Sequence, residues 1–382
     1  MNQYEAALSQ HPLATSAVGE VAGELLERFD GERPDLLVVF ASPHHVGTFE
    51  DVVTALRTLL EPRVLLGATA VSIIAGPREV EDAPAIAAWA ARFDDDAALT
   101  PVSLRLVQTA DGPAVVGWPD GVADEHTLLL LADPFTFPVD AFLSRMNDDL
   151  PQLRVLGGLA SAARAPGGNR LVLDDEIVSE GAVGVFLGPD VEVRTVVSQG
   201  CRPIGRPFTV TKAEGNLVQE LGGRSALERL QELAGMVDED DRALMQRGLH
   251  VGLVVDEHKA DFERGDFLVR NVLGADHANG AIAVGDTVNV GQTLQFHVRD
   301  ADAADDDLHA LLTGEDARAA LLFTCNGRGR HLFGEPDHDA GVVEKLLGPI
   351  PVAGAFCAGE IGPVGGRNFL HGFTASLALF RD

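Results

Sequence analysis

Residues 320–355 read ALLFTCNGRGRHLFGEPDHDAGVVEKLLGPIPVAGA, and this pattern predicts a strand, a helix and a second strand. The apolar runs at 320–323 and 351–355 predict strands that are buried on both faces. The apolar face of the intervening helix carries Val342, Val343, Leu346 and Leu347. A crossover between parallel strands needs roughly 30 residues, so we expect the two strands to lie parallel in one sheet.

The same pattern occurs twice earlier in the chain. Apolar runs at 36–40 and 64–66 flank a helical segment, and so do the runs at 128–131 and 155–158. Each second run ends in small residues, which allow a backbone or a ligand to approach closely. The recurrence suggests an ancient duplication, although any α/β protein yields units of this kind.

Other segments add helices and strands around these units. The pattern predicts helices at 18–29 and 217–236, and it predicts a solvated loop for the acidic segment 300–308. The further strands are expected at 170–173, 176–178, 181–187, 192–197 and 373–380.

The expected fold is mixed α/β (α+β), with two domains built from βαβ crossover units and added β-hairpins. The best boundary follows residue 211, because Pro203, Gly205 and Pro207 interrupt the stretch before it. We therefore expect a helical N-terminal segment at 1–34, a first domain at 35–212 and a second domain at 213–382.

The charge balance excludes several classes of partner. The chain has 382 residues, of which 58 are acidic and 29 basic, giving a formal charge of −29. Nucleic acid and acidic membrane surfaces are not expected as partners, because phosphates are met by clustered Lys and Arg. The start of the chain lacks the features of a signal peptide, and no apolar run approaches the ~20 residues of a membrane helix. A cytoplasmic protein is expected.

The sequence motifs give no cofactor or metal prediction. The phosphate-loop pattern GxxxxGK and the hydrolase pattern GxSxG are missing. The three Cys show no CxxC spacing, so neither a disulfide framework nor a zinc ribbon is indicated. His331 and His338 lie near Asp337 and Asp339, but no His pair has the i, i+4 spacing of helical metal ligands.

Two turns of the third unit carry the candidate site. Asn326, Gly327 and Arg328 follow its first strand, and the segment 357–362 follows its second. The carboxyl ends of parallel strands meet at one sheet edge, where α/β proteins bind ligands. Arg328 offers a planar fork for a carboxylate, Glu360 could accept hydrogen bonds from an ammonium group, and Asn326 could do either. The pair suits a zwitterion such as an amino acid, and the alternative is a structural Arg328–Glu360 ion pair.

A nucleophilic cysteine is a second interpretation of the same turns. Cys325 or Cys357 could serve a hydrolase or transferase if a base such as His331 or His371 lay nearby. The commoner role of a free Cys is that of a small buried apolar residue.

These motifs resemble the FIST family. The segments 325–329, 352–363 and 370–372, together with 267–270 and 280–282, resemble its carboxyl-terminal domain. The segments 67–69, 157–160 and 181–183, with the hairpin before the last of them, resemble its amino-terminal domain. The resemblance covers nearly the whole chain beyond the first helix.

The resemblance implies a sensory module for small ligands, with amino acids as the proposed class, and it implies no catalytic mechanism. We therefore expect non-covalent binding of a small polar metabolite for signalling, with a signalling protein as partner. The alternatives are the Cys-dependent enzyme and a protein-interaction scaffold. Arg270 and His371 join the candidates because of their place in the matched motifs. The expected ligand-binding residues are Asn326, Gly327, Arg328, Cys357, Gly359, Glu360, Gly362, Arg270 and His371.

Overall fold

The computed structural model describes residues 2–94, 97–259 and 261–381, and the chain divides into two compact units. The first unit comprises Met1–Val197, Leu308–Leu370 and Thr374–Asp382. The second comprises Ser198–Asp307 and His371–Phe373. The second unit is thus inserted into the chain of the first. Helices and strands mix in both, which confirms the expected mixed α/β class.

The first unit contains the three expected crossover units. In each, two strands pair in parallel and a helix connects them, as the apolar runs predict. Their elements are β2 (Leu36–Ala41), α2 (Phe49–Leu60) and β3 (Val64–Thr69); β9 (Thr127–Ala132), α3 (Val139–Asp149) and β10 (Arg154–Leu159); and β22 (Ala319–Cys325), α8 (His338–Leu347) and β23 (Val352–Cys357).

The return strand of each unit has a glycine where the neighbouring strand comes closest. These residues are Gly67, Gly157 and Gly354. A Cβ atom added to them would lie 2.4, 2.0 and 1.8 Å, respectively, from a carbonyl oxygen of the strand paired in parallel. The recurrence of this contact in three units supports their derivation from one ancestral unit.

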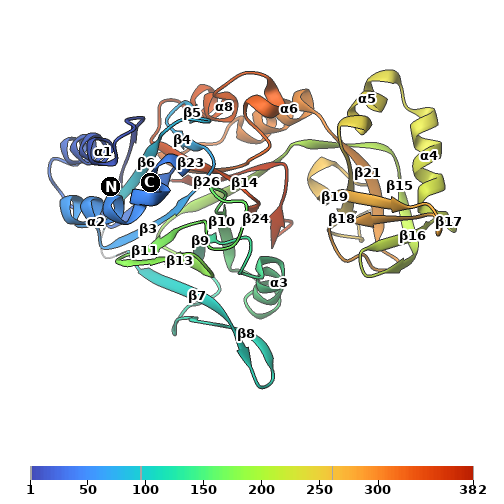
Figure 1. Ribbon diagram of the computed structural model, residues 1–382, viewed down its shortest axis with the longest axis horizontal. Coiled ribbons are helices and arrows are strands. Elements are labelled where there is room, and N and C mark those ends of the chain that lie inside the picture. The colour runs from blue at the N-terminus through green and yellow to red at the C-terminus, as the bar shows by residue number, and fades with distance from the viewer. Residues whose placement is uncertain (1, 95–96, 260, 382) are drawn as a thin grey trace. The chain divides into compact units, whose positions relative to one another are not determined.

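Three sheets make up the first unit (Figure 1). Parallel pairs lie inside each sheet, and antiparallel strands extend it. The first sheet has the order β1 (Gln3–Ser9), β6 (Ile86–Arg92), β2, β3, β11 (Leu171–Leu173), β12 (Glu176–Val178). The second has the order β25 (Arg367–His371), β24 (Glu360–Val364), β10, β9, β13 (Ala182–Leu187), β7 (Leu99–Thr109), β8 (Gly112–Val116). The third has the order β14 (Val193–Gln199), β26 (Thr374–Phe380), β22, β23, β4 (Ile73–Ala75), β5 (Arg78–Val80).

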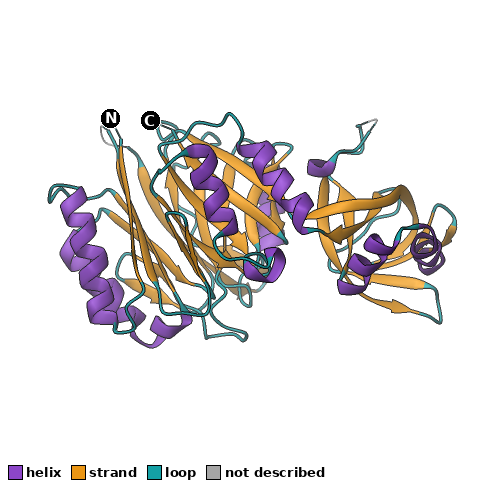
Figure 2. Ribbon diagram, turned by 90° about the horizontal axis from the view of Figure 1, so that it is seen from above, coloured by secondary structure: helices purple, strands orange, loops and turns teal. Residues whose placement is uncertain are grey.

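The main core lies between the inner faces of these sheets. Trp89 packs on Phe380 at a ring-centroid distance of 4.7 Å, and Phe40 meets Phe323 edge to face at 6.0 Å. The outer faces are covered by helices: α1 (Ala14–Arg28) and α2 on the first sheet, α3 on the second, and α8 on the third. In Figure 2 the strands of the first unit stand between these helices.

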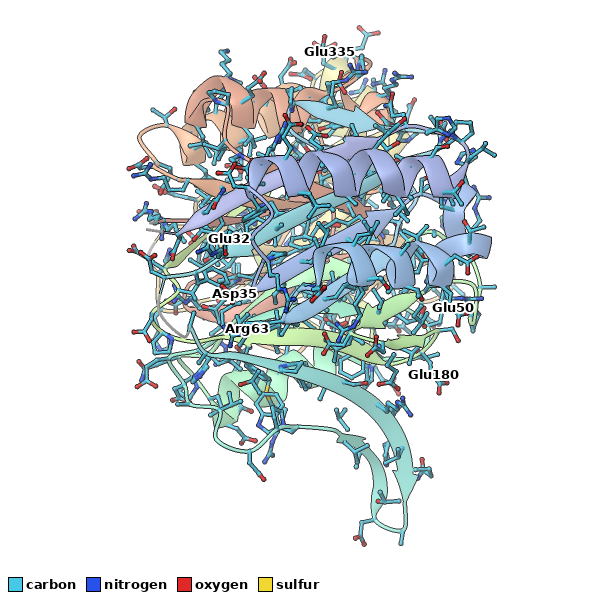
Figure 3. All side chains as sticks on the ribbon, turned by 90° about the vertical axis from the view of Figure 1, so that its left-hand side faces the viewer. Glu32, Asp35, Glu50, Arg63, Glu180 and Glu335 are labelled. Carbon is cyan, nitrogen blue, oxygen red and sulfur yellow. The ribbon has the colours of Figure 1, made fainter. Side chains whose placement is uncertain are left out.

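Helices α1 and α2 lie side by side over the first sheet (Figure 3). Asp35 and Arg63 lie next to one another below them in Figure 3 and form an ion pair of 2.9 Å. Each precedes a strand of the first parallel pair, so this ion pair joins the amino ends of β2 and β3.

The two halves of the chain exchange strands within the first unit. β24 joins the second sheet next to β10, with Gly157 opposite Ile361 and Gly158 opposite Glu360. β4 joins the third sheet next to β23, with Ile74 opposite Gly354. Each half therefore contributes strands to a sheet that contains a parallel pair of the other half.

The second unit is a seven-stranded sheet with two helices on it. Its order is β15 (Cys201–Glu214), β21 (Thr293–Arg299), β18 (Leu249–Val254), β19 (Phe267–Asp276), β20 (Ala281–Val284), β16 (Leu217–Leu221), β17 (Arg224–Ser225). The helices are α4 (Ala226–Met236) and α5 (Glu239–Arg247). The remaining elements of the chain are α6 (Ala301–Leu312), α7 (Arg330–Phe333) and the 3₁₀ turns Pro43–Thr48 and Arg264–Asp266.

Three secondary-structure predictions were wrong. The segment 1–34, expected to be helical, begins with the strand β1, and its helix α1 covers only Ala14–Arg28. The segment 217–236, expected to be one helix, is the strand β16 followed by the helix α4. Gly222 and Gly223, which lie between these elements, have positive φ values of 58° and 73° that do not fit a right-handed helix. The expected loop at 300–308 lies mostly in α6, whose Ala304 and Leu308 are buried, so burial of one face outweighs the acidity of the other. Within the described part of the chain, each helix is too short or too polar to cross a membrane.

Candidate functional site

The two predicted turns are neighbours at the carboxyl edge of β22 and β23. Cys325 and Cys357 are paired in the parallel register, and the Asn326 amide donates to the Cys357 carbonyl oxygen at 2.9 Å. This confirms that the crossover brings both turns to one edge. The residues that follow the two strands, Asn326 and Ala358, are exposed. The edge therefore reaches solvent.

The Arg328 side chain is fully buried and faces a carboxylate of its own chain. Its Nε donates to Asp339 Oδ2 at 2.7 Å and its Nη2 to Asp339 Oδ1 at 2.8 Å. The Arg328 guanidinium, which we expected to bind a ligand carboxylate, thus binds the carboxylate of Asp339. The alternative of a structural ion pair between Arg328 and Glu360 is also wrong, because the ion pair is formed with Asp339. Arg328 Nη1 is buried with no hydrogen-bond partner.

Asp339 is held from several sides. The Thr324 hydroxyl donates to Asp339 Oδ2 at 2.6 Å, and His338 Nδ1 lies 3.0 Å from Oδ1. Burial alone would raise the pKa of Asp339, but the Arg328 guanidinium and these hydrogen bonds hold it well below its usual range. Phe333 stacks on the His338 ring and lies 5.2 Å from the Arg328 guanidinium carbon. The guanidinium is therefore both neutralised and fixed in orientation.

Glu360 is buried at the start of β24 and uses only one of its oxygens. Its Oε2 accepts from the Thr374 amide at 3.2 Å and from the Thr374 hydroxyl at 2.8 Å, while Oε1 has no hydrogen-bond partner. Burial raises the pKa of Glu360 to about 8, against the opposing effects of Thr374 and the Arg328 charge. At neutral pH the carboxyl group is mostly protonated, so it can donate as well as accept.

Residues 158–161, from the amino-terminal half of the chain, pack against the carboxyl edge of β23. A Cβ atom on Gly158 would lie 2.4 Å from Cys357 Sγ, so the glycine leaves room for the sulfur. The Leu159 amide donates to the Gly359 carbonyl at 2.9 Å, and the Ser161 hydroxyl donates to the Phe356 carbonyl. The small residues at the ends of the return strands thus permit close approach between the two halves.

The other predicted residues fall into two groups. Gly327 and Gly359 belong to the same edge as Arg328, and Gly362 lies where a Cβ would come 2.6 Å from Val197. Arg270 and His371 belong to the second unit. Arg270 Nε donates to Asp286 there at 2.7 Å.

Sequence reasoning missed two members of the buried cluster. Asp339 was noted only as a polar neighbour of His338, although its position in the first turn of the crossover helix points it toward the same sheet edge. Nothing in the sequence pattern indicated Glu79 on β5, because its contact with α8 joins parts of the chain that lie far apart in sequence. Its Oε1 accepts from the Ala340 amide at 3.0 Å, and Oε2 has no hydrogen-bond partner. Burial and the nearby Asp339 raise the pKa of Glu79 to about 8.

The remaining chemistry of the edge is limited. Cys325 and Cys357 are thiols, and burial raises the pKa of Cys357 above its usual value. Across residues 2–94, 97–259 and 261–381, no three His, Cys, Asp or Glu side chains are grouped so that they could hold a metal ion. Cavities of about 630, 450 and 400 Å³ open elsewhere on the first unit, and Arg328 and Glu360 line none of them.

The protonated state of Glu360 predicts a pH dependence of stability. Its pKa rises from an ordinary 4.5 to about 8 on folding, so the folded protein holds a proton that the unfolded chain releases between these values. The free energy of unfolding should therefore fall between pH 4.5 and pH 8, by on the order of a few kcal/mol for this group. Urea denaturation at pH 5 and pH 8 measures the change. Glu360→Gln should reduce it, and an unchanged pH slope in the variant would contradict the assignment.

Comparison with other proteins places these features in a family. A FIST N domain model matches residues 35–224, and a FIST C domain model matches residues 226–363. The uncharacterized protein Mb0898c of Mycobacterium bovis is 46% identical over 377 residues, which are 97% of each chain. The uncharacterized protein MT0656 of Mycobacterium tuberculosis is 45% identical over 381 residues, which are 98% of each chain.

FIST domains are described as sensory domains that bind small ligands in signalling. The two matches together cover most of the chain, and the strand exchange between β10 and β24 joins the segments that they match. This chain therefore belongs to the FIST family and carries both its N and its C domain.

Proposed function

We propose that the protein binds a small polar metabolite, with amino acids as the first class to test, and acts as a cytoplasmic sensor in signalling. The observation that carries the proposal is a pair of unused atoms. Arg328 Nη1 and Glu360 Oε1 are buried without hydrogen-bond partners, although buried polar groups nearly always have one. Leaving such a group unsatisfied costs about 1–3 kcal/mol, and a bound ligand that pairs with both atoms would remove that cost.

The charges of the site favour a ligand without net charge. Asp339 neutralises Arg328, and Glu360 is mostly protonated at neutral pH. A zwitterion would place its carboxylate near Nη1 and its ammonium group near the Glu360 carboxyl. Binding to the ammonium group would favour the ionised form of Glu360, so uptake of the ligand should release a proton near neutral pH.

Entry of the ligand requires movement at the exposed end of the site. Arg328 and Glu360 are fully buried, whereas Asn326 is exposed and Gly327 is half-buried. We propose that the turn at 326–327 opens to admit the ligand and that Asn326, Gly327 and Gly359 contact it. The energy of opening would lower the affinity, and a signalling protein could recognise the changed turn.

Calorimetry with a panel of amino acids tests this proposal. At least one ligand should bind the wild-type protein, and Glu360→Gln should weaken its binding by about tenfold or more. Glu79→Gln is the matched control, since Glu79 has a similar burial and pKa but hydrogen-bonds the start of α8. Equal binding by wild type and Glu360→Gln, or no binding by any member of the panel, would contradict the proposal.

The Cys-dependent enzyme is less well supported by the geometry. An activated cysteine has a lowered pKa, whereas burial raises that of Cys357. Iodoacetamide labelling of the native protein at neutral pH distinguishes the two functions, because a catalytic thiol would react quickly and these buried thiols should react slowly.

A further inference from the structure

Two thiols occupy paired positions at the carboxyl edge of the third crossover unit. Cys325 ends β22, Cys357 ends β23, and the register makes them Cα partners. Neighbouring strands lie about 4.8 Å apart, which falls within the Cα separation of about 4.4–6.8 Å that a disulfide requires.

The two side chains also point to the same side of the sheet. Side chains alternate between the two faces of a strand, and paired residues of neighbouring strands share a face. Phe323 and Ala355, two positions before each cysteine, both belong to the central core, as does Cys357. The two side chains therefore lie on the same inner face, where rotation about χ1 would bring the sulfur atoms toward one another.

A small oxidant can reach the two thiols from the solvent at the carboxyl edge of β22 and β23. Cys325 is 7% exposed and Cys357 is 3% exposed, and the residue after each is exposed. The susceptibility of a cysteine to peroxide rises with its exposure, so we expect Cys325, the more exposed of the two, to react first. Cys201, the third cysteine, belongs to the second unit and has Arg299 opposite it in the sheet.

We propose that Cys325 and Cys357 form a reversible disulfide when a peroxide oxidises the protein. The Cys325 thiol loses its proton, and the thiolate attacks a peroxide oxygen, which breaks the O–O bond and gives a sulfenic acid and a hydroxide that takes up this proton to become one water. The Cys357 thiol then attacks the Cys325 sulfur, which releases a second water and forms the S–S bond. Two thiols and one hydrogen peroxide thus give one disulfide and two waters. A small dithiol reductant reverses the reaction.

This modification would tie together the turns that carry Arg328 and Glu360. It stands on the strand register alone and does not depend on whether the site binds a metabolite. The disulfide closes the loop that contains α7 and α8, so the oxidised protein should melt at a higher temperature than the reduced protein.

Thiol counting after peroxide treatment tests the inference. The native protein is exposed to hydrogen peroxide, denatured and alkylated, and its peptides are identified by mass spectrometry without reduction. One of the three cysteines, Cys201, should remain alkylatable, and the 325 and 357 peptides should be joined with the loss of two hydrogens. Dithiothreitol should restore all three thiols and the original melting temperature.

Serine variants of the three cysteines distinguish the disulfide between Cys325 and Cys357 from other oxidation products. Cys201→Ser should form the disulfide as the wild type does, whereas Cys325→Ser and Cys357→Ser should not form it. Three alkylatable thiols after treatment, a bond that includes Cys201, a bond between two chains, or oxidation of Cys325 to sulfinic acid without a bond would each overturn the inference.

Discussion

Arg328→Ala should lower the free energy of unfolding by about 3–5 kcal/mol, because it leaves the buried Asp339 carboxylate without its partner. Both side chains have no exposed surface, and two hydrogen bonds of 2.7 and 2.8 Å join them. Asp339 keeps its contacts to Thr324 and His338 in the variant, but these do not replace a full charge. Urea denaturation followed by circular dichroism measures the loss.

An exposed ion pair supplies the matched control. Arg145 Nε lies 2.5 Å from Asp149 Oδ2 on α3, and the Arg145 side chain is 72% exposed. Arg145→Ala should change the free energy of unfolding by at most about 1 kcal/mol. The double variant Arg328→Met with Asp339→Leu should be more stable than Arg328→Ala alone, since it leaves no buried charge. Equal losses for Arg328→Ala and Arg145→Ala would contradict the role of burial.

Gly354→Ala should destabilise the first unit by about 3 kcal/mol or more. The added Cβ would lie 1.8 Å from the Leu322 carbonyl oxygen of β22, and this atom belongs to the backbone of a central strand. Relief requires the two strands to separate, which weakens their hydrogen bonds and the packing beneath them. Thermal denaturation should therefore show a lower melting temperature.

Gly341→Ala is the control for this change. Gly341 lies inside α8, and a Cβ atom there would have nothing within 4 Å. Since Ala favours helix over Gly by about 1 kcal/mol, this variant should be more stable than the wild type. If Gly354→Ala were as stable as Gly341→Ala, the close approach of β22 and β23 would be wrong.

The crossover units could be predicted because their signal is local. The runs at 36–40, 128–131 and 320–323 are apolar without alternation, which is typical of strands covered on both faces. The meeting of the turns after Cys325 and Cys357 followed from the direction of parallel strands. The short strands β4 and β5 were not predicted, whereas the equally short β11 and β12 were, because the turn at Asp174 and Asp175 marked the latter pair as a hairpin.

The partner of Arg328 could not be read from the sequence for a different reason. Spacing placed Arg328 and Glu360 at the same edge, but it could not show that Asp339 on α8 lies closer to the guanidinium. That distance depends on how the crossover helix sits on the sheet. Similarly, Leu217 and Leu221 fit a helical period, yet both lie in a strand that pairs with its neighbours in the second unit.

The pairing of β10 with β24, and of β23 with β4, has an evolutionary consequence. A gene split near residue 225, between the two family matches, would produce fragments that each lack strands for their sheets. The open edges would attract other chains and favour aggregation. Recombination that shuffled either half alone would therefore be selected against, and the two halves should be inherited as one piece.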